Sequence, residues 1–439
     1  MTNPFAIRRL GPSRIPSPVK LPPAPTEAHP AFVSEQEFIL LDIDSHGIDD
    51  PSPTAERGIL EKAGPRENLF FAPGRVHAAI VTCGGLCPGL NDVIRSIVMT
   101  LYYQYSVRSV SGVPYGYRGL LPDAPWPLVP LDPKTVARIH KQGGTILGTA
   151  RGGGDKTKQI VDTLQRQGVD ILFTIGGDGT QRGAALIADE VHARGLSIAV
   201  VGIPKTIDND LSFVEKSFGF ETAVSEAQRS VDGAHSEAEG SINGIGLVKV
   251  MGRDSGFIAA HTALASNDVD FVLIPEVPFD LEGKGAFLEC LERRIEEKGH
   301  ALVLVAEGAG QKYVESEGID AGGNKKFGDI GIFLRTAIQK YFAAADLEVS
   351  LKYIDPSYTI RSLPACASDS IYCARLGANA VHAAMSGRTA CLVGRMNNRL
   401  VHVPIGGAAG RRNRVDPYGP LWRDVVNDTG QPLTMLATP

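Results

Sequence analysis

Residues 171–180 read ILFTIGGDGT, a short apolar run that ends in two glycines and an aspartate. Similar apolar runs occur elsewhere in the chain, at residues 78–82, 198–203, 245–250, 271–274 and 302–306. Continuous runs of this length, rich in β-branched residues and without alternation, are typical of strands buried on both faces of a parallel sheet. The sequence therefore predicts an α/β fold.

The stretches between these runs have the features of helices. Asp155 is placed to cap a helix that Gly168 would end, and Thr180 is placed to open one that Gly195 would end. The alternation continues over about 300 residues, more than one sheet usually holds, so we expect two Rossmann-like parallel-sheet domains facing a cleft.

Composition excludes several classes of protein. The 439 residues are 43% hydrophobic and 21% charged, with 44 basic and 49 acidic residues and a net charge of −5. This balance is typical of a globular protein and gives no broad positive field for nucleic acid. No apolar run reaches the roughly 18 residues of a membrane span, and no secretory signal is present. Six cysteines without a C-x-x-C pair predict reduced thiols and a cytoplasmic location, with organelle targeting left open.

The first 75 residues differ in composition from the rest. Prolines recur through residues 4–30 and acidic residues cluster over 42–50, so we expect an N-terminal extension that is either mobile or wraps a neighbour. We expect residues 76–217 to form a first domain, completed by about 360–388. Residues 218–359 would form a second domain, completed by about 389–439.

Two glycine turns follow predicted strands, GGLCPGLN at 84–91 and GGDGT at 176–180. In a strand–turn–helix unit, glycines let backbone amides approach a phosphate at the helix N-terminus. A glycine turn can also serve the backbone alone, but two of them with an embedded aspartate favour phosphate binding. Neither G-x-x-x-x-G-K-[ST] nor G-x-G-x-x-G after a strand is present, so a P-loop or dinucleotide fold has little support.

Residues 204–210, PKTIDND, follow the run 198–203. Asp208 and Asp210 stand two residues apart, and like charges this close repel unless a cation or a proton relieves them. An Asx turn that merely ends the strand is the alternative. In phosphoryl transfer, one carboxylate accepts a hydroxyl proton, another holds Mg²⁺, and Lys205 offsets phosphate charge.

Further charged residues follow later predicted strands. Arg253 stands in MGRDSG (251–256), Glu307 precedes two glycines, and Lys352, Tyr358 and Arg361 lie in KYIDPSYTIR (352–361). A surface ion pair would also account for Arg253, and a helix cap for Glu307. Cations gathered at strand ends suit an anionic substrate.

Seven motifs in this order resemble the 6-phosphofructokinases: GGLCPGLN, GTAR (148–151), GGDGT, PKTIDND, MGRDSG, AEG and YIDPSYTIR. Among these the chain is most similar to the long branch with plant-type and trypanosomatid-type ATP enzymes. The resemblance covers residues 76 to about 400 and leaves the extension unsupported.

The resemblance implies that ATP phosphorylates the 1-hydroxyl of fructose 6-phosphate, with Mg²⁺ as cofactor and a homo-oligomer, dimer or tetramer, as the assembly. Asp208 would be the general base and Asp210 its partner near Mg²⁺, with Lys205 and Arg253 completing the catalytic set. The metal would bind Asp178. The donor site would comprise Gly85, Arg151, Gly152, Gly177, Asp178, Gly179 and Thr180. The sugar phosphate would contact Thr206, Ile207, Asp208, Met251, Gly252, Arg253, Glu307, Lys352, Tyr358 and Arg361.

The chain departs from the bacterial-type pattern at the 6-phosphate, where two arginines are replaced by Lys352 and Gly244. Lysine cannot form the bidentate pair of hydrogen bonds that arginine forms with a phosphate, so the residues that bind the 6-phosphate are not assigned at this point.

The identity of the donor depends on Gly179. Pyrophosphate-using relatives carry aspartate there together with the lysine seen here as Lys205, whereas bacterial-type ATP enzymes carry glycine at both positions. Glycine leaves room for the α-phosphate and adds no repulsion, which favours ATP over the alternative, pyrophosphate. A related GGDGT-type kinase is not expected to carry PKTIDND and MGRDSG. A non-catalytic regulatory subunit would lack base or metal carboxylates, and Asp178, Asp208 and Asp210 are all present.

Overall fold

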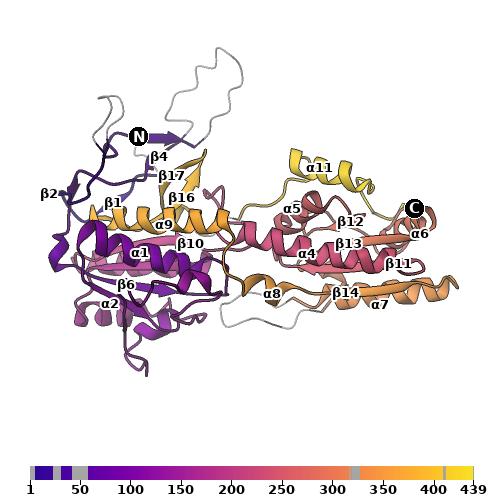
Figure 1. The fold of residues 1–439 in the computed structure, drawn as a ribbon, viewed down its shortest axis with the longest axis horizontal. Coiled ribbons are helices and arrows are strands. Elements are labelled where there is room, and N and C mark those ends of the chain that lie inside the picture. The colour runs from indigo at the N-terminus through magenta and orange to yellow at the C-terminus, as the bar shows by residue number, and fades with distance from the viewer. Residues whose placement is uncertain are drawn as a thin grey trace, which may run out of the picture. The chain divides into compact units, whose positions relative to one another are not determined.

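The computed structural model describes residues 5–22, 31–41, 58–315, 318, 327–408 and 412–438. The chain divides into two compact units (Figure 1). Unit 1 comprises residues 1–206, 211–219 and 363–411, and unit 2 comprises residues 207–210, 220–362 and 412–439. Residues 389–411 therefore belong to unit 1 and not to the second domain as expected. The reason is that β16 (Cys391–Met396) pairs with β10 (Ala199–Pro204) and β17 (Arg399–Pro404) pairs with β16.

Unit 1 is built on a nine-stranded sheet in the order β3-β4-β17-β16-β10-β9-β6-β7-β8. The five central strands are parallel, and they include β6 (His77–Thr82), β7 (Ser109–Val113) and β9 (Ile171–Gly176). The outer strands run antiparallel: β3 (Phe38–Leu40), β4 (Ile59–Lys62), β17 and β8 (Val129–Pro130). The predicted strands at 78–82, 171–175 and 198–203 are confirmed in this sheet.

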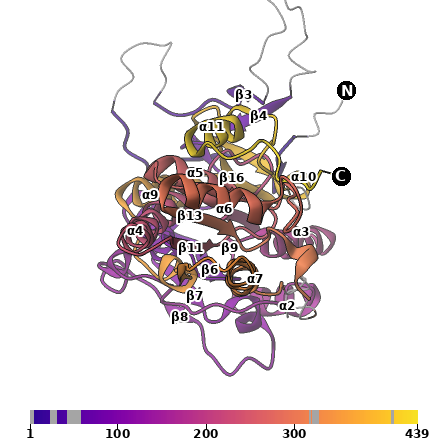
Figure 2. The ribbon, with the colours of Figure 1, turned by 90° about the vertical axis from the view of Figure 1, so that its right-hand side faces the viewer.

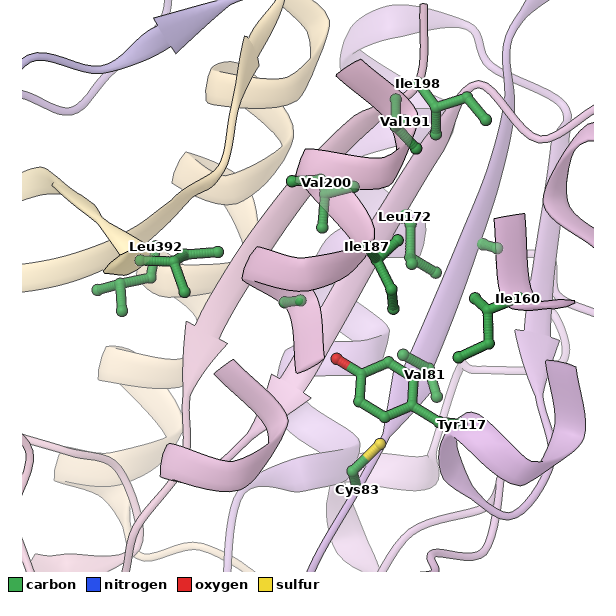
Figure 3. Close-up of a cluster of buried hydrophobic side chains, with 14 of the residues drawn as sticks. Val81, Cys83, Tyr117, Ile160, Leu172, Ile187, Val191, Ile198, Val200 and Leu392 are labelled. Atoms are coloured by element: carbon green, nitrogen blue, oxygen red, sulfur yellow. The ribbon is translucent and has the colours of Figure 1, made fainter. Parts of the chain in front are cut away.

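Helices pack on the sheet in two pairs. Helix α2 (Thr157–Arg166) contacts α3 (Asp178–Ala193), and α1 (Leu90–Tyr105) contacts α9 (Ala367–Met385). Figure 3 shows the first of these layers, in which Ile160 and Ile187 lie among Val81, Leu172 and Val200 of the strands. All five side chains are fully buried, which accounts for the unbroken apolar runs in the sequence.

The N-terminal extension is part of unit 1 wherever it is described. Besides β3 and β4, β1 (Arg8–Arg9) pairs with β15 (Arg388–Thr389) and β2 (Ile15–Pro16) pairs with β5 (Asn68–Leu69). Leu60 and Leu69 are fully buried. Of the two alternatives expected for the extension, a mobile segment does not fit residues 8–9, 15–16, 38–40, 59–62 and 68–69, because they pair as strands within unit 1. The proline-rich residues 23–30 and the acidic residues 42–50 lie outside the described residues.

Unit 2 is built on a parallel sheet in the order β12-β13-β11-β14, of which β11 and β13 are labelled in Figure 2. Its strands are β11 (Gly244–Val250), β12 (Phe271–Leu273), β13 (His300–Ala306) and β14 (Ser350–Ile354). One core forms with α4 (Phe220–Glu239), α5 (Phe257–Ser266) and α11 (Pro420–Thr429). A second core forms with α6 (Phe287–Lys298) and α7 (Ile330–Ala344). Parallel sheets between helices in both units confirm the α/β class with two Rossmann-like domains.

Candidate active site

The first group of candidate residues lies in unit 1, where β9 passes into α3. Helix α3 begins at Asp178, two residues earlier than predicted, so the amides of Asp178, Gly179 and Thr180 all belong to its first turn. The N–H of Thr180 donates to the carbonyl of Gly177, whereas those of Asp178 and Gly179 precede the hydrogen bonds of the helix and lie at the positive end of its dipole. A Cβ at Gly176 would lie 2.2 Å from Oγ1 of Thr180, so only glycine fits there. The GGDGT turn thus offers backbone donors to an anion.

Asp178 and Gly179 differ in their surroundings. The side chain of Asp178 is 14% exposed and forms an ion pair with Arg182 at 3.2 Å. Gly179 is exposed, and a Cβ built on it would meet nothing closer than Nη2 of Arg182 at 3.9 Å. The space above the first turn of α3 is therefore open at Gly179.

Lys205 connects the two glycine turns of unit 1. It directly follows β10, is 7% exposed, and its Nζ donates a hydrogen bond of 3.0 Å to the carbonyl of Gly85. Its backbone N–H donates to the carbonyl of Gly176. One buried ammonium group is therefore held between the strand ends of β6 and β9.

The GTAR segment joins the same group through its backbone. The N–H of Gly84 donates to the carbonyl of Ala150, and Oγ1 of Thr149 donates to the carbonyl of Gly84 at 2.7 Å. Arg151 is exposed, and Gly152 has a left-handed φ of 81°. The structure thus brings the predicted donor residues to one edge of the unit 1 sheet, since the carboxyl ends of parallel strands meet there.

The second group lies in unit 2 around Asp208. Burial and the negative charges of Asp210 and Glu307 raise the pKa of Asp208 far above its ordinary value, while the N–H of Arg253 donates to its carboxylate and acts in the opposite direction. The backbone carbonyl of Asp208 accepts a hydrogen bond from Oγ of Ser255 at 3.3 Å. A carboxylate with a raised pKa can take up a proton near neutral pH, as a general base requires.

Backbone hydrogen bonds hold the ends of β11 and β13 together. Glu307 donates its N–H to the carbonyl of Val250, and Gly308 donates to that of Gly252. Gly252 has a φ of 132°, which other residues rarely adopt, and a Cβ at Gly308 would overlap the carbonyl of Arg253. Burial raises the pKa of Glu307, and the charges of Arg253, Lys249 and Arg361 oppose this. The MGRDSG and AEG motifs are therefore one structural site.

Three of the predicted sugar-phosphate residues lie on β14 and α8 (Ser357–Arg361). The guanidinium of Arg361 lies 4.3 Å from the centre of the Tyr358 ring, and Tyr358 is 73% exposed. Lys352 lies within β14 opposite Gly246, and not at the carboxyl end of the sheet with the other two. Thr206 is the last residue of unit 1 before the chain enters unit 2 at Ile207.

Two basic residues belong to this site although the sequence analysis did not select them. Arg412 forms ion pairs with Asp254 and, at 3.6 Å, with Asp210. Lys249 is nearly buried in β11 and pairs with Asp329 at 2.8 Å and Asp355 at 2.9 Å. The run RRNR at 411–414 was the available signal for Arg412, but nothing local connects it with Asp210.

A metal would have carboxylates available in both groups. Mg²⁺ usually takes one or two protein carboxylates and completes its shell with phosphate oxygens and water, and Asp178 fits this pattern.

Within the described ranges, no helix combines the length and apolar character that crossing a membrane requires.

Comparison with known proteins finds relatives in one family. The sequence profile of the family described as Phosphofructokinase matches residues 77–384, more than half of the chain. The ATP-dependent 6-phosphofructokinase of Borreliella burgdorferi is 56% identical over 418 residues, 93% of this chain and 93% of that protein. The ATP-dependent 6-phosphofructokinase of Trypanosoma brucei brucei is 46% identical over 371 residues, 84% of this chain and 75% of that protein.

Solved structures add a likeness in fold. A pyrophosphate-dependent phosphofructokinase from Marinobacter aquaeolei matches with a TM-score of 0.66 at 20% identity, covering 81% of this chain and 91% of that one. At this identity the likeness shows the fold alone.

Proposed function

The chain belongs to the phosphofructokinase family, and from this premise we propose that it is an ATP-dependent 6-phosphofructokinase. It transfers the γ-phosphoryl group of ATP to the 1-hydroxyl of fructose 6-phosphate, giving fructose 1,6-bisphosphate and ADP. The observation that carries the proposal is the buried carboxylate of Asp208, set beside Asp210, Glu307 and the backbone of Arg253.

Asp208 takes the proton of the 1-hydroxyl as the oxygen attacks phosphorus. Its raised pKa makes it a stronger base than an ordinary aspartate, and general-base catalysis of this kind contributes about 10²- to 10⁴-fold. Asp210 keeps that pKa high through its charge. Arg412, paired with Asp210 and Asp254, fixes the paired-carboxylate turn as a positioning residue.

The donor binds through unit 1. Backbone amides of Gly177, Asp178 and Gly179 and of the Gly85 turn receive the phosphates, together with Thr180, Arg151 and Gly152, and Lys205 balances their charge. Mg²⁺ at Asp178 would neutralise charge on the phosphates when bound. Gly179 leaves room for the α-phosphate of a nucleotide, which supports ATP as the donor.

The sugar phosphate binds through unit 2. Arg253 and Arg361 supply guanidinium groups, and Tyr358 offers an exposed ring beside Arg361. Lys352 contributes charge from the middle of β14. A homo-oligomer and a cytoplasmic location stay predictions.

The test is initial-rate kinetics of the full chain with fructose 6-phosphate and Mg²⁺, with either ATP or pyrophosphate as donor. We expect formation of fructose 1,6-bisphosphate with ATP and a much lower kcat/KM with pyrophosphate. Equal or better use of pyrophosphate would contradict the donor assignment, and no product with either donor would contradict the enzyme assignment.

A further inference from the structure

A cluster of potential metal ligands lies in unit 2 and is not used by the proposed reaction. His235 and Glu239 stand one helical turn apart at the end of α4, and His300 is the first residue of β13. One ligand atom from each residue lies within 4.8 Å of the other two. Among the described residues this is the one group of three or more such side chains so close together.

The fold brings these residues together by packing α4 on the sheet. Helix α4 lies beside β11 and β13 (Figure 1) and contacts both. Gly244 of β11 is the register partner of His300. The rings of His235 and His300 meet edge to face with centroids 5.3 Å apart. Nε2 of His235 lies 3.4 Å from Oε1 of Glu239. Metal–ligand bonds of about 2.1 Å in a tetrahedral arrangement place neighbouring ligand atoms about 3.4 Å apart.

Hydrogen bonding within the described chain does not account for the two histidines. Nδ1 of His235 is buried and has no hydrogen-bond partner there. The ring of His300 likewise forms no hydrogen bond to any described residue, although it touches the ring of His235. A buried polar atom without a partner costs about 1–3 kcal/mol, and a metal ion bound at Nδ1 would remove this cost, whereas one bound at Nε2 would not.

From this cluster we propose that His235, Glu239 and His300 form a binding site for a divalent transition metal ion of the Zn²⁺ type. Two imidazoles and one carboxylate suit Zn²⁺, whereas Mg²⁺ and Ca²⁺ prefer oxygen ligands alone. The side chain of Glu239 is 58% exposed and can close on the ion by rotation, and water fills the fourth position.

We expect the metal ion to stabilise the fold and not to take part in the reaction. His300 starts β13 and Glu307 follows its last residue, so the metal lies about 20 Å from Glu307, at the opposite end of the strand. Bound metal joins the last turn of α4 to the start of β13. We therefore expect Zn²⁺ to stabilise unit 2 without supporting catalysis.

The experiment is calorimetric titration of Zn²⁺ into the tag-free, EDTA-treated full chain in buffer with excess Mg²⁺. The variants are His235→Gln, Glu239→Gln and His300→Gln, and the matched control is His192→Gln, an exposed histidine on α3. We expect one Zn²⁺ per chain in the wild type and the control, with a rise in Tm. Loss of a ligand should weaken binding at least about tenfold.

Thermal unfolding of each variant in EDTA shows that it is folded and makes weakened binding attributable to the site. If His300→Gln and His235→Gln bind Zn²⁺ as tightly as the wild type, the ion binds elsewhere and the proposal is wrong. Absence of binding to the wild type would overturn it as well, and would leave His235 and Glu239 as an ordinary helical pair.

Discussion

Units 1 and 2 share a parallel sheet between helices but bury their charges in different places. In unit 2, Asp208, Asp210 and Glu307 gather beyond the carboxyl ends of β11 and β13. In unit 1 the strand ends carry glycine turns and the buried ammonium group of Lys205, whereas the buried charges Glu61 and Arg388 lie on β4 and β15, away from those turns. We therefore expect buried charges at the carboxyl ends of the parallel strands to take part in the reaction, and buried charges elsewhere in the fold to contribute to stability.

The cluster of unit 1 is a set of ion pairs and hydrogen bonds around Glu61. Glu61 accepts from Arg66 at 3.0 Å, from Arg388, and from Nδ1 of His402 at 3.1 Å. Although burial alone would raise the pKa of Glu61, the hydrogen bonds from His402 and Arg388 and the charge of Arg388 lower it. Every charge there has a partner, whereas in unit 2 the like charges raise the pKa of Asp208.

The largest effect is expected for Asp208→Asn. Removing the base should lower kcat by about 10²- to 10⁴-fold, while binding of fructose 6-phosphate largely survives. Steady-state kinetics at saturating substrates measures this, with Asp268→Asn, an exposed aspartate of unit 2, as the control. A variant that keeps more than half of the wild-type kcat would remove Asp208 from the role of base.

Glu61→Gln should have its effect on stability. Removing one partner of a buried ion pair leaves the others uncompensated and typically costs about 3–5 kcal/mol. Urea unfolding of the variant should show this loss, while the exposed Glu67→Gln should unfold like the wild type. Wild-type stability in Glu61→Gln would show that the cluster of unit 1 is dispensable.

Low pH should reduce the stability of the part of unit 1 that contains Glu61, His382 and His402. Burial lowers the pKa of His382 to about 4 and lowers that of His402 as well. Since the unfolded chain binds these protons near pH 6.5 and the folded chain does not, stability is full above that pH and falls as pH drops below it. From pH 6.5 to 4, His382 alone accounts for about 3 kcal/mol.

The measurement is Tm as a function of pH for the wild type and for His382→Gln. The variant should lose less stability than the wild type between pH 6.5 and 4. Parallel curves for the two proteins would mean that another group causes the acid sensitivity.

The smallest effect concerns the glycine turn of unit 1. Gly179→Asp places a carboxylate where the α-phosphate of ATP passes, and two unit charges about 4 Å apart repel by about 4 kcal/mol at an effective dielectric of 20. Solvent and metal reduce this, so we expect at least a tenfold loss of kcat/KM for ATP and little change for pyrophosphate. Gly233→Asp, in open space on α4, is the control. Full ATP activity in Gly179→Asp would refute this reading of the turn.

The buried strands of both units and the turns that follow them could be predicted from the sequence. The apolar runs have a single explanation in buried parallel strands, and the glycine and carboxylate turns directly follow them. The start of α3 was misplaced by two residues, because Gly177 takes an extended conformation and Asp178 already lies in the helix.

The rest depends on contacts between distant parts of the chain. Arg412 reaches Asp210 from the far end of the sequence, and Lys249 resembles an ordinary strand residue until Asp329 and Asp355 pair with it. The N-terminal strands β1 and β2 have two residues each, too short for a periodic pattern. The extension joins the nine-stranded sheet through β3 and β4, and Arg8 and Arg9 form a separate two-stranded sheet with β15, and neither pairing can be read from the local sequence.

The most direct test of the contrast between the units measures kcat and the urea midpoint together for Asp208→Asn and Glu61→Gln. We predict that Asp208→Asn loses at least about 100-fold in kcat with an unchanged or higher midpoint, since it removes a repelling buried charge. Glu61→Gln should lose stability and keep its kcat under conditions in which it is folded. The account would be contradicted if Asp208→Asn lost stability and kept its activity, or if folded Glu61→Gln lost activity as severely as Asp208→Asn.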